Sequence, residues 1–185
     1  MRVCSKKLSN CKLPYAIAVL FLCAFNATVR AQTFSIEHVN DSLNYLVLTE
    51  SGQTDKWELP YPVYQFQTGD VDGDGKPDAL VGVIKGTRYY PEKARRLFIY
   101  KNKNGRVRAM WMGSRVGGPI DDFRFVDGRI RVLGHTTDGK YVVAEYRWQG
   151  FGLEFIRYLC KNEDETTARR YLEENDEKGR TKERE

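Results

Sequence analysis

The residues with the clearest chemistry in this sequence are four closely spaced aspartates, Asp70, Asp72, Asp74 and Asp78. Carboxylates this close together repel one another unless a cation lies between them. Oxygen ligands without His or Cys select a hard cation, and a flexible loop favours Ca²⁺ over the octahedral geometry that Mg²⁺ demands. We therefore expect these side chains, with the backbone carbonyl of Lys76, to bind one Ca²⁺. The alternative is a solvated acidic turn.

This loop differs from an EF-hand at its end. With Asp70 as position 1, an EF-hand has a bidentate Glu at position 12, where this chain has Val81. The apolar segment 79–84 then predicts a buried strand and not a helix. An Asp-x-Asp-x-Asp-Gly-x-x-Asp loop that enters a strand resembles the FG-GAP repeat (VCBS, integrin alpha N-terminal-like), over residues 66–84. The resemblance implies a Ca²⁺ bound between two strands of a β-propeller blade.

The rest of the chain is predicted to supply strands that position this loop. It is rich in Tyr, Phe, Val and Ile, and turn signals such as Asn104-Gly105 and Asp127-Gly128 separate the apolar alternations. The expected strands are 34–39, 43–50, 54–59, 62–69, 79–86, 96–101, 106–113, 121–126, 129–136, 140–148 and 151–159.

These strands form repeating units in the sequence. Residues 63–112 and 120–159 each contain four strands, and residues 34–59 contain three. The expected fold class is therefore all-β, with antiparallel blade-like repeats that form an incomplete β-propeller. Because a closed propeller needs about four or more blades, a β-sandwich, a barrel or an association of chains remains open.

The first 31 residues are typical of a secretory signal peptide. They contain five basic residues, no acidic residue, and an apolar run from Tyr15 to Phe25 that is short for a bilayer span. Small residues at Val29 and Ala31 predict cleavage near Gln32, and so a secreted or periplasmic protein without a transmembrane segment. The alternative is a lipid anchor on Cys23.

Removal of this leader changes the charge and cysteine arguments. The full chain has 30 basic and 25 acidic residues, and the five leader charges account for the whole excess. Nucleic-acid binding, which needs a basic footprint, is therefore not expected. Cys160 is the one cysteine outside the leader, which excludes an intrachain disulfide there. Its apolar strand favours a buried thiol over a catalytic thiol or an intermolecular disulfide.

Basic residues gather between residues 85 and 131, which contain 13 basic and four acidic residues. The arginines of segments 106–112 and 129–132 alternate with apolar residues, which predicts that they face solvent. The simple interpretation is a solvated sheet face, and the functional one is a surface for an acidic glycan, a lipid headgroup or an acidic protein. The candidate partner-binding residues are Arg88, Tyr89, Tyr90, Arg95, Arg96, Arg106 and Arg108.

Residues 161–185 differ from the β-repeat domain, which we place at 32–160 with its calcium loop at 70–78. Acidic residues precede basic ones there, as in a helix that complements its own dipole. We expect a short helix over 164–176, followed by a charged, disordered tail.

Catalytic motifs are scarce in this sequence. His38 and His135 are not in zinc-ligand spacing, and no nucleophile elbow or phosphate-binding glycine loop occurs. The favoured hypothesis is a non-enzymatic, calcium-binding, exported β-repeat protein that binds a protein or glycan partner. An inhibitor of a lysozyme-type glycan hydrolase and a carbohydrate-acting enzyme are the alternatives.

Overall fold

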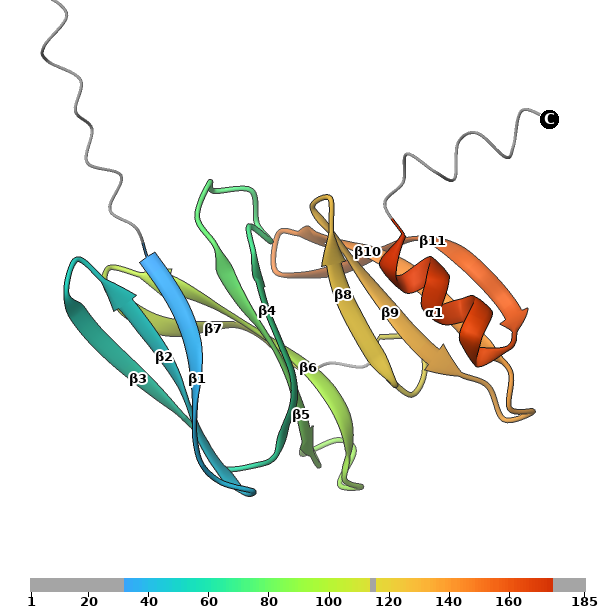
Figure 1. The fold of residues 1–185 in the computed structure, drawn as a ribbon, viewed down its shortest axis with the longest axis horizontal. Helices are drawn as coiled ribbons and strands as arrows, with labels where there is room; N and C mark the ends of the chain where they lie inside the picture. Colours follow the sequence, from blue (N-terminus) through green and yellow to red (C-terminus); the bar gives the residue numbers. More distant parts are fainter. Residues whose placement is uncertain (1–31, 114–115, 175–185) are drawn as a thin grey trace, which may run out of the picture. The chain divides into compact units, whose positions relative to one another are not determined.

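The computed structural model describes residues 32–113 and 116–174, so the expected leader and most of the expected tail lie outside the described residues. Within these ranges the chain forms three antiparallel sheets and one helix (Figure 1). Sheet 1 contains β1 (Gln32–Asn40), β2 (Leu43–Glu50) and β3 (Gln53–Leu59). Sheet 2 contains β4 (Val63–Gly69), β5 (Asp78–Lys85), β6 (Ala94–Lys103) and β7 (Arg106–Met112). Sheet 3 contains β8 (Asp122–Val126), β9 (Arg129–His135), β10 (Tyr141–Gln149) and β11 (Gly152–Glu163), and the helix is α1 (Glu165–Glu173).

The all-β, blade-like architecture expected from the sequence is confirmed. Each sheet is a meander in which strands that follow one another in sequence are also hydrogen-bonded neighbours. The three sheets coincide with the three repeat units, and the described strands do not close into a barrel. The expected strands are all present, although β11 extends to Glu163 and not to 159.

The tight turns explain why the repeats are visible in the sequence. Asn104 and Gly105 both have positive φ, 57° and 76°, as a two-residue hairpin turn requires. Asp127 and Gly128 adopt the same conformation, with φ of 50° and 72°. Asn, Asp and Gly tolerate this left-handed region better than other residues, so these pairs fix where β6 turns into β7 and β8 into β9.

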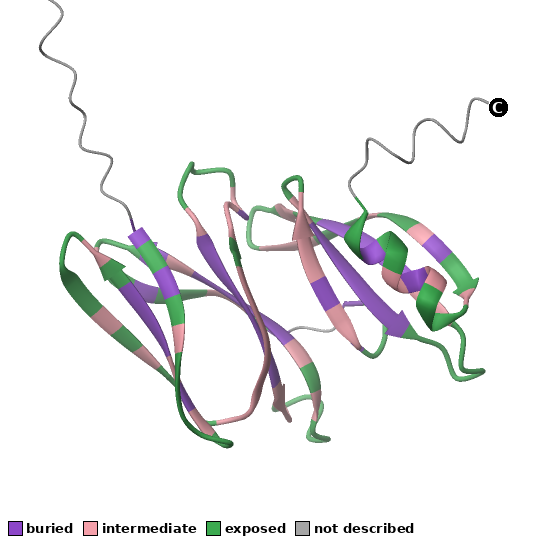
Figure 2. Cartoon of the chain, in the orientation of Figure 1, coloured by how far each residue is buried: buried purple, intermediate pink, exposed green. Residues whose placement is uncertain are grey.

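Sheet 2 is buried on both of its faces. Leu80, Leu97 and Ile99 belong to an apolar cluster shared with Phe123 and Ile130 of sheet 3. The alternate residues of the same strands, among them Val81 and Phe98, pack in a second cluster with the inner face of sheet 1. Figure 2 shows buried residues in the central strands of sheet 2 and also in β9 of sheet 3. Because two faces must be apolar, β5 is a continuous apolar run without alternation.

The outward face of sheet 1 carries polar residues, whereas that of sheet 3 is covered by a helix. On sheet 1, Lys56 pairs with Glu37 at 2.6 Å and lies over the ring of Tyr45. On sheet 3, α1 covers the outer face and buries Ala168 and Leu172. A polar face and a helix thus occupy the positions where a closed propeller would have further blades.

The helix begins as the sequence predicts but is shorter than expected. Asp164 is its N-cap and accepts a hydrogen bond from the backbone of Thr167. The last helical residue is Glu173, whereas the sequence predicts helix to 176; residues from 175 onwards are outside the described ranges.

The prediction that Arg131 faces solvent is wrong. Its side chain is only 2% exposed and lies beside Glu145 of β10. Alternation along β9 does place Arg131 on the outer face of sheet 3, but α1 folds back over that face and buries it. The pattern therefore identified the face correctly and failed to identify what covers it.

Candidate metal site

The aspartate loop is held at both ends by the β4–β5 hairpin. Gly69, the last residue of β4, pairs with Asp78, the first residue of β5. A Cβ atom at Gly69 would lie 2.1 Å from Cδ1 of Phe125, so a larger residue would displace that ring. The close approach of β8 thus requires glycine where the strand enters the loop.

Backbone N–H groups of the loop donate to its own carboxylates. The N–H groups of Gly73 and Gly75 donate to the two oxygens of Asp70, at 2.8 and 2.9 Å. The N–H of Val71 donates to Oδ2 of Asp78 at 3.0 Å. These bonds order the loop around the carboxylates and leave part of each carboxylate available to a cation.

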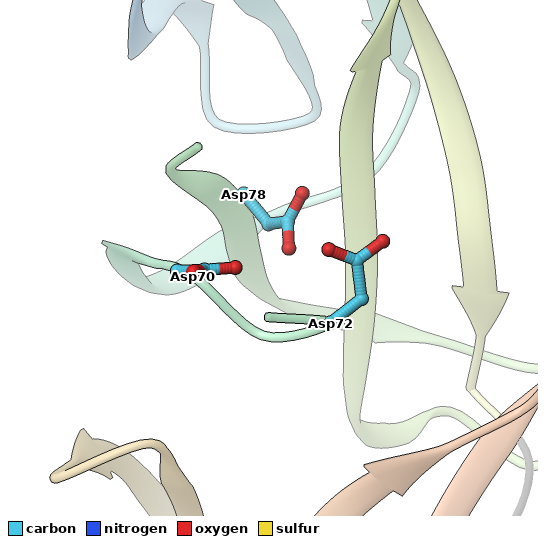
Figure 3. A group of neighbouring side chains, drawn as sticks. All are labelled: Asp70, Asp72 and Asp78. Atoms are coloured by element: carbon cyan, nitrogen blue, oxygen red, sulfur yellow. The ribbon is translucent and has the colours of Figure 1, made fainter. Parts of the chain in front are cut away.

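Three of the four aspartates converge. One carboxylate oxygen from each of Asp70, Asp72 and Asp78 lies within 4.8 Å of the others. Figure 3 shows their side chains directed toward a common space. Asp78 is only 1% exposed, whereas Asp70 and Asp72 are partly exposed. A set of three carboxylates at this spacing can hold a metal ion, and its oxygen-only chemistry fits a hard cation.

The electrostatics of Asp78 reflect this crowding. The pKa of Asp78 is raised to about 7, chiefly by burial; the backbone bond from Val71 opposes this rise, and the negative charge of Asp72 adds to it. A buried carboxyl beside a second carboxylate resists ionisation because burial removes the water that would stabilise its charge, and the attraction of Lys101 offsets only part of this cost. A bound cation would provide that stabilisation.

The fourth aspartate binds a lysine and lies outside the converging group. Asp74 Oδ2 accepts a hydrogen bond from Lys101 Nζ at 3.1 Å. The same ammonium group also contacts Oδ2 of Asp72, and that hydrogen bond raises the pKa of Lys101 to about 12. The expected four-carboxylate site is therefore a three-carboxylate group with a lysine at its side.

Sequence reasoning did not identify Lys101. It lies 29 residues from Asp72 in the chain, so no local motif connects them. The register of sheet 2 is the signal that could have found it: Tyr100 pairs with Ala79, which places Lys101 next to the start of β5. Predicting this contact requires the exact pairing of β5 with β6 and not merely the presence of both strands.

The expected partner-binding residues separate into two groups. Arg88, Tyr89, Tyr90, Arg95 and Arg96 lie in the β5–β6 turn and the first residues of β6. Arg106 and Arg108 lie on β7, where Arg108 pairs with Lys101 near the other end of β6. At about 3.3 Å per residue, the six residues from 95 to 101 place the groups about 20 Å apart along the strand. One small ligand therefore cannot contact both.

Both histidines that the structure describes bond to polar side chains. His38 Nδ1 lies 2.5 Å from Oδ1 of Asn44, and His135 Nδ1 lies 2.7 Å from Oδ2 of Asp121. The neighbouring Asp122 instead contacts Arg124 and Arg169, so the two adjacent aspartates have different partners. Sequence reasoning did not connect His135 with Asp121, which lies 14 residues earlier.

Among the described residues, no helix has the length and apolar character needed to cross a membrane. Comparisons with known proteins identify no family: no protein-family model matches the chain, and no curated protein matches it either.

Proposed function

We propose that this chain is a non-enzymatic, exported binding protein whose second sheet is stabilised by one Ca²⁺. The observation that carries the proposal is the convergence of Asp70, Asp72 and Asp78 at the mouth of the β4–β5 hairpin. The resemblance of this loop to FG-GAP repeats supports Ca²⁺ as the cation. In this proposal the backbone carbonyl of Lys76 completes the site. Asp74 becomes a further ligand if its carboxylate releases Lys101 and binds the cation instead.

The cation's proposed role is structural. Without it, three carboxylates share a small space, and Lys101 and the backbone N–H groups of the loop offset their repulsion in part. With it, the loop that connects β4 to β5 gains ligand bonds at both ends. Since β5 is the most continuously buried strand of sheet 2, order in this loop stabilises the core on both faces of that sheet.

The bonding of the two histidines supports a binding protein over an enzyme. Among the described residues, His38 pairs with an amide and His135 with a carboxylate, and neither is bonded to a Ser, Thr or Cys nucleophile. Cys160 is buried beneath α1, and burial raises the pKa of its thiol, which disfavours the reactive thiolate.

Calcium is expected to raise the melting temperature of the chelator-treated protein. At a hundred-fold excess of free Ca²⁺ over the dissociation constant, the added stability is about 2.7 kcal/mol. Replacement of Asp72 by Ala, or of Asp78 by Asn, removes a ligand charge and should abolish this dependence. Scanning calorimetry at several Ca²⁺ concentrations, together with isothermal titration, measures both effects.

Asp41→Ala is the matched control, because Asp41 is an exposed aspartate in the turn between β1 and β2. It should retain the full calcium response. If neither binding heat nor a change in melting temperature occurs at millimolar Ca²⁺, the loop is an acidic turn and the proposed metal role is wrong.

Export is expected to remove the first 31 residues. Mass spectrometry of the protein isolated from its native host should show a chain that begins at Gln32, because Val29 and Ala31 provide the small residues that signal peptidase prefers. A chain that begins with a lipid-modified Cys23 would instead indicate a membrane-anchored lipoprotein, and a chain that retains Met1 would contradict export through a cleaved leader.

A further inference from the structure

The described residues around the β5–β6 turn and the segment before β8 line an open cavity of about 580 Å³. One wall is the turn between β5 and β6, with Tyr89 and Tyr90, and the other is the segment 116–121 that precedes β8. Pockets that bind small molecules typically measure about 300–1,000 Å³ and combine an apolar lining with a few polar groups. This cavity has both properties and lies outside the aspartate loop.

The turn that forms the first wall is fixed by its own backbone. The N–H of Thr87 donates to the carbonyl of Tyr90 at 2.7 Å, and the N–H of Tyr90 donates back to the carbonyl of Thr87 at 3.2 Å. A Cβ at Gly86 would lie 2.2 Å from the carbonyl oxygen of Pro91, so only glycine permits this closure. The turn therefore presents Tyr89, which is 81% exposed, from an ordered backbone.

The second wall is held against β9. The N–H of Asp121 donates to the carbonyl of Leu133 at 2.8 Å. A Cβ at Gly134 would lie 2.5 Å from the carbonyl oxygen of Pro119, so glycine allows the segment to approach the strand closely. Val116 and Ile120 are buried and provide an apolar floor. With both walls fixed, a ligand loses little affinity to ordering of the protein.

Three nitrogen-bearing side chains line the cavity. Arg96 lies with its guanidinium 5.6 Å from the centre of the Tyr90 ring, and its Nε is buried without a hydrogen-bond partner among the described residues. Arg95 donates to the carbonyl of Asp121. His135 bonds to Asp121 through Nδ1, so this bond does not use its Nε2. A buried donor without a partner requires an acceptor, and a ligand oxygen in the cavity can supply it.

The charge of the turn favours an anion. Residues 86–96 contain four basic residues, Arg88, Lys93, Arg95 and Arg96, against one acidic residue, Glu92. The other acidic group of the lining, Asp121, is already bonded to His135. The guanidinium fork of arginine matches the two oxygens of a carboxylate.

We propose that this cavity binds an acidic sugar of the hexuronate type. The carboxylate of the sugar binds Arg96 and Arg95, its ring lies against Tyr89 and Tyr90, and its hydroxyl groups face His135. An inorganic phosphate would satisfy the arginines but leave most of the cavity and both tyrosine rings unused. The inference rests on the proposed binding role and names its ligand class, but it does not require the metal.

Titration with sodium galacturonate and with sodium digalacturonate, followed by isothermal calorimetry, tests the proposal. Galactose is the neutral control for the carboxylate, and sodium phosphate is the control for a simple anion. The buffer contains a chelator, because uronates themselves bind Ca²⁺ through oxygen. Failure of calcium binding therefore leaves this result unaffected, and failure of sugar binding leaves the calcium melting curves unaffected.

We expect both uronates to bind, and galactose and phosphate to bind more weakly by at least about tenfold. Galactose lacks the charged hydrogen bonds of the carboxylate, and phosphate lacks the ring contacts. Arg96→Gln should weaken uronate binding by at least about tenfold. Tyr89→Ala should also weaken it, and because Tyr89 is 81% exposed this variant is expected to fold. Arg147→Gln removes an exposed arginine of sheet 3 and should leave binding unchanged.

Three outcomes would overturn the proposal. The first is the absence of uronate binding by folded protein at tens of millimolar sugar. The second is equal binding of galactose or phosphate, which would show that the carboxylate or the ring is not recognised. The third is full affinity in Tyr89→Ala and in Arg96→Gln, which would place uronate binding somewhere else.

Discussion

Replacement of Arg131 by Met is expected to lower the free energy of unfolding by about 3–5 kcal/mol, the usual cost of leaving one member of a buried ion pair without its partner. Arg131 and Glu145 are 2% and 3% exposed, and Nε of the arginine lies 3.6 Å from Oε2 of the glutamate. Without Arg131, the carboxylate of Glu145 retains, among the described residues, only the half-exposed Arg157 as an opposite charge. Since most domains are stable by about 5–15 kcal/mol, this loss is a large fraction of the total.

The same substitution should also loosen α1. Nη1 of Arg131 donates to the carbonyls of Tyr171 and Glu174, which belong to the last turn of the helix and its C-cap. These carbonyls have no partner within the helix, so a buried guanidinium that binds them connects the helix end to β9. Because α1 covers Cys160, the thiol of Arg131→Met should react faster with a disulfide reagent while the sheets remain folded.

Chemical denaturation and thiol-reaction rates measure the two effects. Arg147→Met is the matched control: its pair with Glu154 is about half exposed, so it should cost no more than about 1 kcal/mol and leave Cys160 protected. The double change Arg131→Met with Glu145→Leu removes both charges and should recover much of the stability. A loss below about 1 kcal/mol in Arg131→Met, with unchanged thiol protection, would contradict this account.

The fold was predictable from local patterns. Alternation and turn residues identified each strand, because the side-chain period of a strand and the positive φ of pairs such as Asn104-Gly105 are local properties. The grouping of strands into three units followed, because neighbours in a meander are also neighbours in the chain. Nothing beyond short-range physics was needed for these features.

The environment of the charged residues was not predictable in the same way. Arg131 has the alternation of a solvent-facing residue and becomes buried only because α1, more than 30 residues later, returns to β9. His135 and Asp121 meet because segment 116–121 lies along β9. Such contacts depend on tertiary packing between distant segments, which binary patterning leaves open. The converging aspartates were predictable because they all lie within one short loop.

At the candidate metal site, Lys101 is the residue whose contacts depend on tertiary packing and not on local sequence. Its ammonium group contacts Asp72 and Asp74, the positions where a loop of this type would direct ligands to a cation. It therefore stabilises the loop without metal and would compete with the proposed cation for the same oxygens. The proposed calcium affinity is then a balance between two cations, one of which is part of the chain.

Replacement of Lys101 by Met is accordingly expected to have opposite effects with and without Ca²⁺. In chelator, the melting temperature should fall, because the aspartates lose the charge that offsets their repulsion. Calcium affinity should rise by about tenfold or more, since a unit charge and a divalent ion about 6 Å apart repel by about 1.4 kcal/mol even at the dielectric constant of water. The calcium-induced rise in melting temperature should therefore exceed that of the unmodified protein.

Lys103→Met provides the control, because Lys103 is an exposed lysine on the same strand, two residues beyond Lys101. Its melting temperature in chelator and its calcium titration should match those of the unmodified protein. If Lys101→Met instead binds Ca²⁺ with unchanged or lower affinity, the lysine does not compete with the ion. The cation would then bind to Asp70 and Asp78, and Asp72 would be a partner of Lys101 and not a metal ligand.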